Sequence, residues 1–310
     1  MEFESIQDFK RNFSEIYHGK VKSKLATFEG DKKRTKLICN IISIIGICIG
    51  VVLCYFLYPS GDVGAMIAGG VVPSSLGFVF SAWLAKNFEK RVKEKVMPDL
   101  MQAFGNFMWT KQSVIECHTI RATTLYNRFE WKDDDDNFYG TYKGININVN
   151  ETKLKYQTRD SKGNRRTHTE FEGVMVQLEL PRNFKAHTVI RKRVALLNKK
   201  VYEEIKLEDP EFMKRYFVDG SDQVESRYLL TTSFMERFKN LQKAFGASGL
   251  EASFNGNNLV IAISTSKDLF RIGKLNRPLA DTKQFTTLLE EFISILAIVD
   301  ELKLNQNIGL

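Results

Sequence analysis

The chain has 310 residues, a formal net charge of +8 at neutral pH and a pI near 9.1. Its mean hydropathy of −0.24 is that of a soluble protein, but this average conceals one long apolar region between Leu37 and Leu84. The four cysteines have neither the spacing of a disulfide framework nor that of a zinc module, which excludes both classes of small stabilised domain.

Residues 1–36 are predicted to form an amphipathic basic helix on the cytoplasmic side. Phe9, Phe13 and Tyr17 recur at helical steps with basic residues between them, and Gly19 is expected to interrupt the helix. The apolar stripe could rest on an anionic leaflet or pack on the rest of the protein. Its breadth in aromatic residues favours packing on protein.

Two uncharged segments, residues 37–57 and 63–84, are each long enough to cross a hydrocarbon core of about 30 Å as a helix. Only the residues from Tyr58 to Asp62 separate them, which predicts an antiparallel transmembrane hairpin over residues 37–85. Basic residues crowd both flanks and are absent from the loop, so we expect an inner-membrane protein with both termini in the cytoplasm. The flanking residues that set this topology are Lys32, Lys33, Arg34, Lys36, Lys86, Lys90 and Arg91.

Small residues predict close packing of the two spans. Gly46 and Gly50 form a G-x-x-x-G step on the first, and Gly69 and Gly70 belong to similar steps on the second. These residues could pack one hairpin or also join copies of the chain into a homo-oligomer. Neither span contains an ionisable residue, which argues against an ion or proton pathway.

Membrane-proximal helices are expected over residues 86–130. A stripe of apolar residues continues at helical spacing across Pro98, which we expect to kink or divide the helix and so to give two helical pieces. This stripe is typical of a core that faces the following domain, although a partner-binding groove stays open. Its members are Phe88, Val92, Val96, Leu100, Met101, Phe104, Phe107 and Met108.

Residues 131–310 are predicted to form a cytoplasmic α+β domain with a mostly antiparallel sheet and flanking helices. Apolar and polar residues alternate over 145–150 and 174–180, as in half-buried strands. Residues 251–254 and 259–263 flank Asn-Gly-Asn-Asn, which predicts a hairpin. A short helix is expected around Val224 and Tyr228, and a second helix opens with a capping box of Ser233 with Glu236 and runs to Phe245, with Gly246 as its stop. A long final helix follows a capping box of Asp281 with Gln284.

A basic cluster lies on and after the strand near Leu154. It could be a hydrated loop, a contact for an anionic membrane surface, or a contact for an acidic protein or nucleic acid. Few aromatic residues interleave with it, so nucleic acid is the least favoured partner. The cluster consists of Lys153, Lys155, Arg159, Lys162, Arg165 and Arg166, with residues 159–168 expected to form an exposed loop.

Candidate catalytic and metal motifs find little support. The acidic run 133–136 could bind calcium, but Phe138 stands where an EF-hand loop needs glycine, so a solvated loop is favoured. Cys117 and His118 are adjacent and would point to opposite faces of a strand. Phosphate-binding loops, dinucleotide motifs and nucleophile elbows do not occur in the sequence. We therefore predict no catalytic residue, metal or cofactor.

Two stretches of the chain resemble a known family. Both are similar to the bacterial domain-of-unknown-function family DUF3137. The first is residues 169–190, TEFEGVMVQLELPRNFKAHTVI, and the second is residues 207–238, LEDPEFMKRYFVDGSDQVESRYLLTTSFMERF. The resemblance implies a membrane-anchored protein without assigned activity, often encoded near LemA-type membrane proteins. Such a protein is therefore a suggested partner, beside the lipid bilayer.

The sequence predicts a membrane-anchored interaction or scaffold domain facing the cytoplasm. Two alternatives remain open. One is a membrane-surface enzyme acting on a lipid or cell-envelope precursor, which would require convergent polar groups in a cleft. The other is a transporter accessory subunit.

Overall fold

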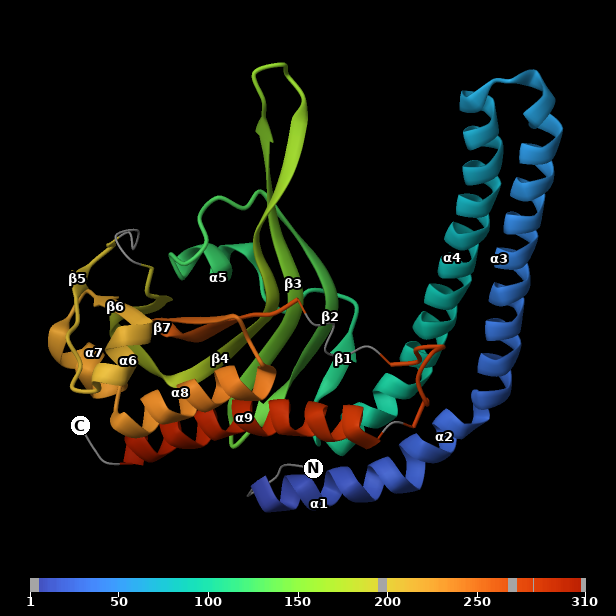
Figure 1. Ribbon diagram of the computed structural model, residues 1–310. Coiled ribbons are helices and arrows are strands. Elements are labelled where there is room, and N and C mark those ends of the chain that lie inside the picture. The colour runs from blue at the N-terminus through green and yellow to red at the C-terminus, as the bar shows by residue number, and fades with distance from the viewer. Residues whose placement is uncertain (1–5, 195–199, 267–271, 281, 308–310) are drawn as a thin grey trace. The chain divides into compact units, whose positions relative to one another are not determined.

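The computed structural model describes residues 6–194, 200–266, 272–280 and 282–307 (Figure 1). The chain divides into two compact units. The sheet unit comprises Met1–Phe13, Met101–Leu269 and Gln284–Leu310, and the hairpin unit comprises Ser14–Leu100 and Phe270–Lys283. The sheet unit thus includes residues before 131, where we expected the α+β domain to begin.

The N-terminal helical region is α1 (Ile6–Ile16), a π-helical turn η1 (Tyr17–Val21) and α2 (Lys22–Thr27). The π turn contains Gly19, the expected point of interruption. Within the sheet unit, the rings of Phe9 and Phe13 lie 5.5 and 5.1 Å from that of Phe104, and Asn12 Nδ2 donates to the Ala103 carbonyl at 3.1 Å. The aromatic stripe therefore packs on protein, the alternative that its breadth favoured.

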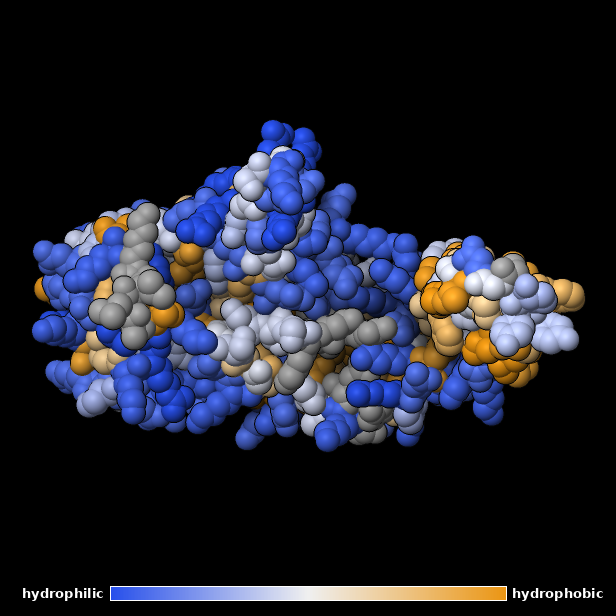
Figure 2. All heavy atoms as spheres, turned by 45° about the horizontal axis from the view of Figure 1, so that its top comes forward, coloured by the Kyte–Doolittle hydropathy of each residue, from blue (hydrophilic) through white to orange (hydrophobic). Residues whose placement is uncertain are grey.

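The hairpin unit consists mainly of α3 (Glu29–Leu57) and α4 (Val63–Ala103), joined by a short turn that includes η2 (Tyr58–Ser60). Both helices are long and apolar enough to cross a membrane. Figure 2 shows hydrophobic residues gathered over this pair. Asp62 starts α4 by accepting the Ala65 amide at 3.0 Å.

The expectation that Pro98 divides the second helix is wrong, since α4 runs without a break through Pro73 and Pro98. A proline removes one backbone hydrogen bond but ends a helix only when little else holds it. Val96, Met97 and Leu100 are fully buried on either side of Pro98, and this packing keeps the helix continuous. Met108 lies beyond the helix, exposed on a short strand.

The sheet unit holds a sheet of seven strands in the order β1-β2-β3-β4-β6-β5, with β7 also paired to β4. All pairings are antiparallel, which confirms the predicted α+β class with a mostly antiparallel sheet. The strands are β1 (Met108–Thr110), β2 (Trp131–Tyr142), β3 (Ile145–Arg159), β4 (Arg165–Lys192), β5 (Glu203–Glu204), β6 (Tyr216–Gly220) and β7 (Gly249–Ser264).

The predicted hairpin over 251–263 is wrong, because β7 is one strand that follows β4 over most of its length. Gly256, at φ +59°, lies opposite Phe184, and the pairing register shifts on both sides of this pair. The extra residues at both shifts belong to β4, between Glu179 and Thr188, so the bulges are on β4 while β7 continues through Asn-Gly. A bulge serves where a long strand must bend with its partner without losing the ladder. A hairpin would leave half of this edge of β4 unpaired.

The predicted loop over 159–168 is also wrong for half of its length. β3 extends to Arg159 and β4 starts at Arg165, so only a tight turn joins them. Asp160 Oδ1 accepts the amides of Lys162 and Asn164 at 2.9 Å each, and Gly163 supplies a φ of +82°. These local bonds close the turn and bring the two strands into register.

Five helices flank the sheet: α5 (Cys117–Ala122), α6 (Pro210–Arg215), α7 (Gln223–Leu229), α8 (Thr232–Phe245) and α9 (Thr282–Asn307). The predicted end of α8 at Gly246 agrees with its φ of +55°, but the cap is Thr231, which accepts the Phe234 amide, and not Ser233. Asp281 and the side chain of Gln284 lie outside the described residues, so the expected capping box does too.

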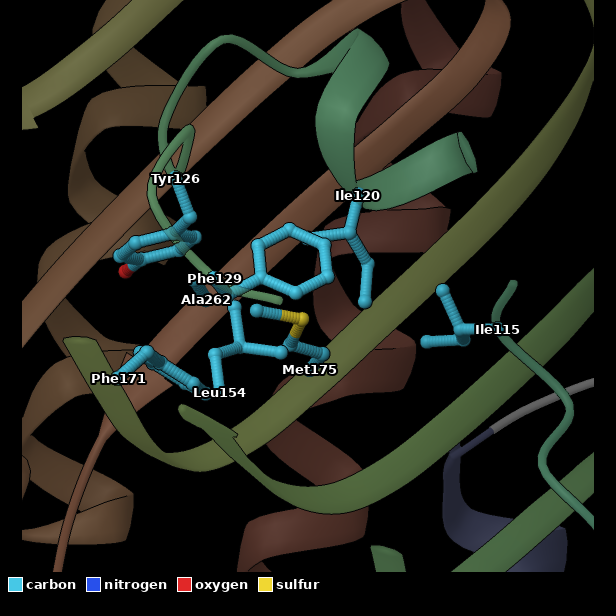
Figure 3. Packing of buried hydrophobic residues seen from close by; sticks show 8 residues of the cluster. All are labelled: Ile115, Ile120, Tyr126, Phe129, Leu154, Phe171, Met175 and Ala262. Carbon is cyan, nitrogen blue, oxygen red and sulfur yellow. The ribbon is translucent and has the colours of Figure 1, made fainter. Parts of the chain in front are cut away.

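A compact apolar cluster fixes α5 and the segment after it on the sheet (Figure 3). Cys117 and His118 begin α5, so the expectation that they lie on a strand is wrong. Ile120 points from this helix toward Met175 of β4. The other members of the cluster are Ile115, Tyr126, Phe129, Leu154, Phe171 and Ala262.

Candidate interaction sites

The first candidate site is the outer surface of α3 and α4. Small residues bring the helix backbones so close that a Cβ atom on Gly50 would lie 2.6 Å from the Gly70 carbonyl, and one on Gly46 would lie 2.8 Å from the Pro73 carbonyl. A Cβ on Gly69 would meet Leu57 at 2.7 Å. Large apolar side chains therefore cover the outside of the pair, where they are exposed: Leu37, Ile44, Ile45, Val51, Val52, Phe56, Ile67, Val71, Leu76, Val79 and Trp83.

Polar groups of the two helices bond to each other across the same contact. Ser81 Oγ donates to the Cys39 carbonyl at 2.9 Å and lies 2.9 Å from Ser43 Oγ, while Cys54 Sγ donates to the Met66 carbonyl at 3.1 Å. The contacts of Ser81 join the start of α3's apolar run to the end of α4's, and the bond from Cys54 joins the opposite ends of the runs near the turn. The basic flanks therefore lie at one end of the pair, and Lys33, Arg34, Lys36, Lys86, Lys90 and Arg91 are exposed there, with Lys32 half-buried.

The second candidate site is a projecting ribbon of β3 and β4, residues 156–168, which we call the basic arm (Figure 1). β2 pairs with β3 only as far as Lys155, and β7 pairs with β4 only as far as Gly173. The arm thus has two exposed edges. Tyr156 and His168 stack across it with ring centroids 5.2 Å apart, and Thr158 Oγ1 lies 2.7 Å from His168 Nε2.

The six predicted basic residues separate into two groups. At the base of the arm, Lys153 pairs with Glu172 at 2.7 Å and Lys155 pairs with Asp133 at 2.5 Å. At the tip, the side chains of Arg159, Lys162, Arg165 and Arg166 are exposed. The backbone amide of Asn164 is the main cause that lowers the pKa of Asp160, the one acidic residue of the arm, so this carboxylate stays charged and fixes the turn.

The third candidate is a buried polar network between β4, β6 and β7. Arg191 forms an ion pair with Asp219, whose other carboxylate oxygen accepts the amides of Val201 and Tyr202 at 2.9 and 3.0 Å. The Arg191 guanidinium also donates to Thr124 Oγ1 at 3.2 Å. Every charge in this set is therefore paired in the interior, as buried ions require.

His187 extends this network. Its Nε2 lies 2.8 Å from Ser253 Oγ and its Nδ1 lies 3.0 Å from the Tyr202 hydroxyl. Burial is the main cause that lowers the pKa of His187, and the charge of Arg191 lowers it further. A serine beside a histidine suggests a nucleophile, but Ser253 is only 1% exposed, so its hydroxyl is closed to a substrate. The arrangement holds three strands together.

Sequence patterns missed this network, although one signal was present. Asp219 is a lone carboxylate in the otherwise apolar strand that begins at Tyr216. A charge in such a strand needs a partner from elsewhere in the fold. The partner, Arg191, belongs to a strand that sequence spacing does not connect to it.

The acidic run is part of β2, so the expectation of a solvated loop is wrong. Asp136 is fully buried and accepts the Trp109 indole N–H at 2.8 Å. Asp133 and Asp135 face a small cavity of about 170 Å³ with Glu151, Glu172 and Lys153. Within the described part of the chain, no group of three or more acidic, histidine or cysteine side chains could hold a metal ion.

The fold and these sites can be compared with known proteins. Residues 169–304, which run from within β4 into α9, match the model of the family described as "Protein of unknown function (DUF3137)", which is the family whose resemblance the sequence showed. Comparison with curated proteins gives no match.

One solved structure is similar: the "crystal structure of the mycobacterial trehalose monomycolate transport factor A, TtfA", at 9% identity and a TM-score of 0.34. The similarity covers 68% of this chain and 94% of that one. At this TM-score the likeness bears on neither fold nor function.

Proposed function

We propose that the protein is an interaction or scaffold protein anchored in the bacterial inner membrane, with the sheet unit on the cytoplasmic side. The observation that carries this proposal is the surface of α3 and α4, where glycines pack the helices together and large apolar side chains remain outside. Exposing such a surface to water costs about 25 cal/mol for each Å² of apolar area, whereas the hydrocarbon core of a bilayer solvates it. The orientation follows from the basic flanks and the uncharged turn at Tyr58–Asp62.

The basic arm is the element that we propose contacts the partner. Its tip combines three arginines with one lysine, beside the stacked Tyr156 and His168. Arginine and tyrosine are enriched in protein interfaces whereas lysine is depleted, and guanidinium groups bind carboxylates in a bidentate manner. This composition supports an acidic protein as the partner. By the family resemblance, a LemA-type membrane protein is the first candidate, and a second copy of the chain is another.

Photo-cross-linking in cells tests the proposal. A photoreactive phenylalanine analogue at the exposed Thr167 should form an adduct with a protein whose cross-linked peptide is acidic. Replacing Arg159, Arg165 and Arg166 by alanine should abolish the adduct. The matched control removes the same charge elsewhere on the sheet unit, through Lys214→Ala, Arg237→Ala and Lys243→Ala, and should leave the adduct unchanged.

Other outcomes would redirect the proposal. Cross-links to lipid alone would replace the protein partner by the membrane surface. Equal adduct in the arm variant and its control would remove the arm from the interface. Recovery of the protein in the carbonate-washed soluble fraction would contradict the membrane anchor itself.

A further inference from the structure

The hairpin unit contains a cleft that the proposed interaction function does not use. It has a volume of about 520 Å³ and lies between α3 and α4 at their basic end. Lys36, Asn40 and Ser43 line it from α3, Phe78 lines it from α4, and Lys274 and Asn276 line it from the segment 272–280. The cleft therefore combines cations, amides and an aromatic wall in one place.

The segment that completes the cleft is held firmly against the helices. Gly273 has a φ of +94°, and a Cβ atom there would lie 3.0 Å from the side chain of Val92, so the chain passes close to α4. Ile272 and Leu279 are buried, and the Leu279 amide donates to Glu29 Oε1 at 3.3 Å. These contacts fix Lys274 and Asn276 in position beside the cleft.

The cleft straddles the predicted boundary of the membrane. Lys36 is the last charged residue before the uncharged run of α3, and Asn40 lies one turn inside that run. Phosphate groups of a bilayer lie at this level, above the hydrocarbon core. A ligand with a charged head and apolar chains would meet both parts of the cleft at once.

The polar side chains that face the cleft would be satisfied by a ligand with a charged head and apolar chains. Within the described part of the chain, the side chains of Lys36, Lys274 and Asn40 form no hydrogen bond or ion pair with protein, whereas those of Ser43 and Ser81 are bonded to each other. An unpaired amide in a membrane span is costly. Lys36 and Asn40 are four residues apart and so share one face of α3, where a phosphate diester could accept from both.

We infer that this cleft binds the headgroup of an anionic glycerophospholipid. The two lysines outnumber the one acidic lining residue, Glu89, so the cleft favours a net negative headgroup. Lys36 and Lys274 bind the phosphate, Asn40 donates its amide to a phosphate oxygen, and Phe78 contacts the start of an acyl chain. The inference rests on the proposed membrane anchor, because in the cell the cleft meets lipid only where α3 and α4 are embedded in a bilayer.

Native mass spectrometry of the full chain in detergent micelles tests the inference. Phosphatidylglycerol and phosphatidylcholine with identical acyl chains are added separately, and the lipid-bound fraction is measured. Phosphatidylglycerol should bind more tightly. The double variant Lys36→Ala/Lys274→Ala should weaken this binding at least about tenfold, since it removes both charge-assisted contacts. Asn40→Leu should weaken it without any change in charge.

The matched control is Lys33→Ala/Lys90→Ala, which removes two exposed lysines of the same flanks that do not line the cleft. It should retain binding, as should the conservative variant Lys36→Arg/Lys274→Arg. Equal losses in the alanine variant and the control, or equal binding of both lipids, would overturn the inference. If the double variant does not fold, Asn40→Leu decides alone.

Failure of the inference is distinguishable from failure of the anchor. Carbonate extraction from cells reports whether the chain is embedded in a bilayer, independently of the lipid in the cleft. A chain that resists extraction but does not discriminate between the lipids keeps its anchor and loses the headgroup site. A chain that is released by carbonate loses both.

Discussion

Gly50→Ala offers a sharp test of the packing between α3 and α4. The new Cβ would lie 2.6 Å from the Gly70 carbonyl oxygen and 2.9 Å from Ser74 Oγ. The first contact is with backbone, which yields only if the helices separate. Overpacking of this kind costs about 1–3 kcal/mol, which corresponds to roughly a 5- to 150-fold change in the equilibrium between packed and separated helices.

Gly30→Ala is the matched control, because Gly30 lies on the same helix and a Cβ atom there would meet no atom within 4 Å. It should be neutral or stabilise α3 by up to about 1 kcal/mol through helix propensity. The comparison isolates the close approach of the two helices from the general effect of removing a helical glycine.

Thiol labelling in detergent micelles measures helix separation directly. Cys54 Sγ is bonded to the Met66 carbonyl of α4, whereas Cys48 is exposed and serves as an internal reference. In rising dodecyl sulfate, Gly50→Ala should expose Cys54 to maleimide at lower detergent than Gly30→Ala or the unaltered chain. If Gly50→Ala labels no faster than Gly30→Ala, the helices do not pack through Gly50.

Two further predictions concern the buried polar network. Asp219→Asn should lower the free energy of unfolding by about 3–5 kcal/mol, because it leaves the Arg191 guanidinium buried without a counter-charge. Glu211→Gln, which breaks an exposed ion pair, should change the free energy of unfolding by less than about 1 kcal/mol. Denaturant unfolding measures both variants. Burial lowers the pKa of His187, so the unfolded chain takes up its proton first as the pH falls below about 6.5, and stability should fall from there until the folded-state pKa is reached. His187→Gln should flatten this dependence and His118→Gln, at an exposed site, should preserve it; an unchanged slope in His187→Gln would contradict the assignment.

Local patterns in the sequence predicted much of the fold because they report burial directly. Ile145, Ile147 and Val149 alternate along β3, and all three are fully buried in the sheet. The close packing of α3 and α4 was predictable for the same reason, since the absence of a side chain at Gly46 and Gly50 is itself the feature that permits contact.

Sequence patterns did not predict the features that depend on residues far apart in the chain. Asn-Gly between two apolar runs is typical of a hairpin, yet β7 continues through Gly256 because β4 pairs with both runs and its own bulges take up the shifts in register. Likewise Lys36, Asn40 and Lys274 belong to no common pattern. They meet only because residues 272–280, which follow the last strand of the sheet along the chain, belong to the hairpin unit.

In the acidic run, a single shift in strand register gives neighbouring aspartates different environments. The register of β2 against β3 shifts between Asp134 and Asn137, so Asp136 is buried beneath Trp109 while Asp133 remains outside and pairs with Lys155. That pair, together with the one between Lys153 and Glu172, neutralises the base of the basic arm. The positive charge of the arm is therefore concentrated at its tip, and under the proposed function an acidic partner would be attracted to the exposed arginines there.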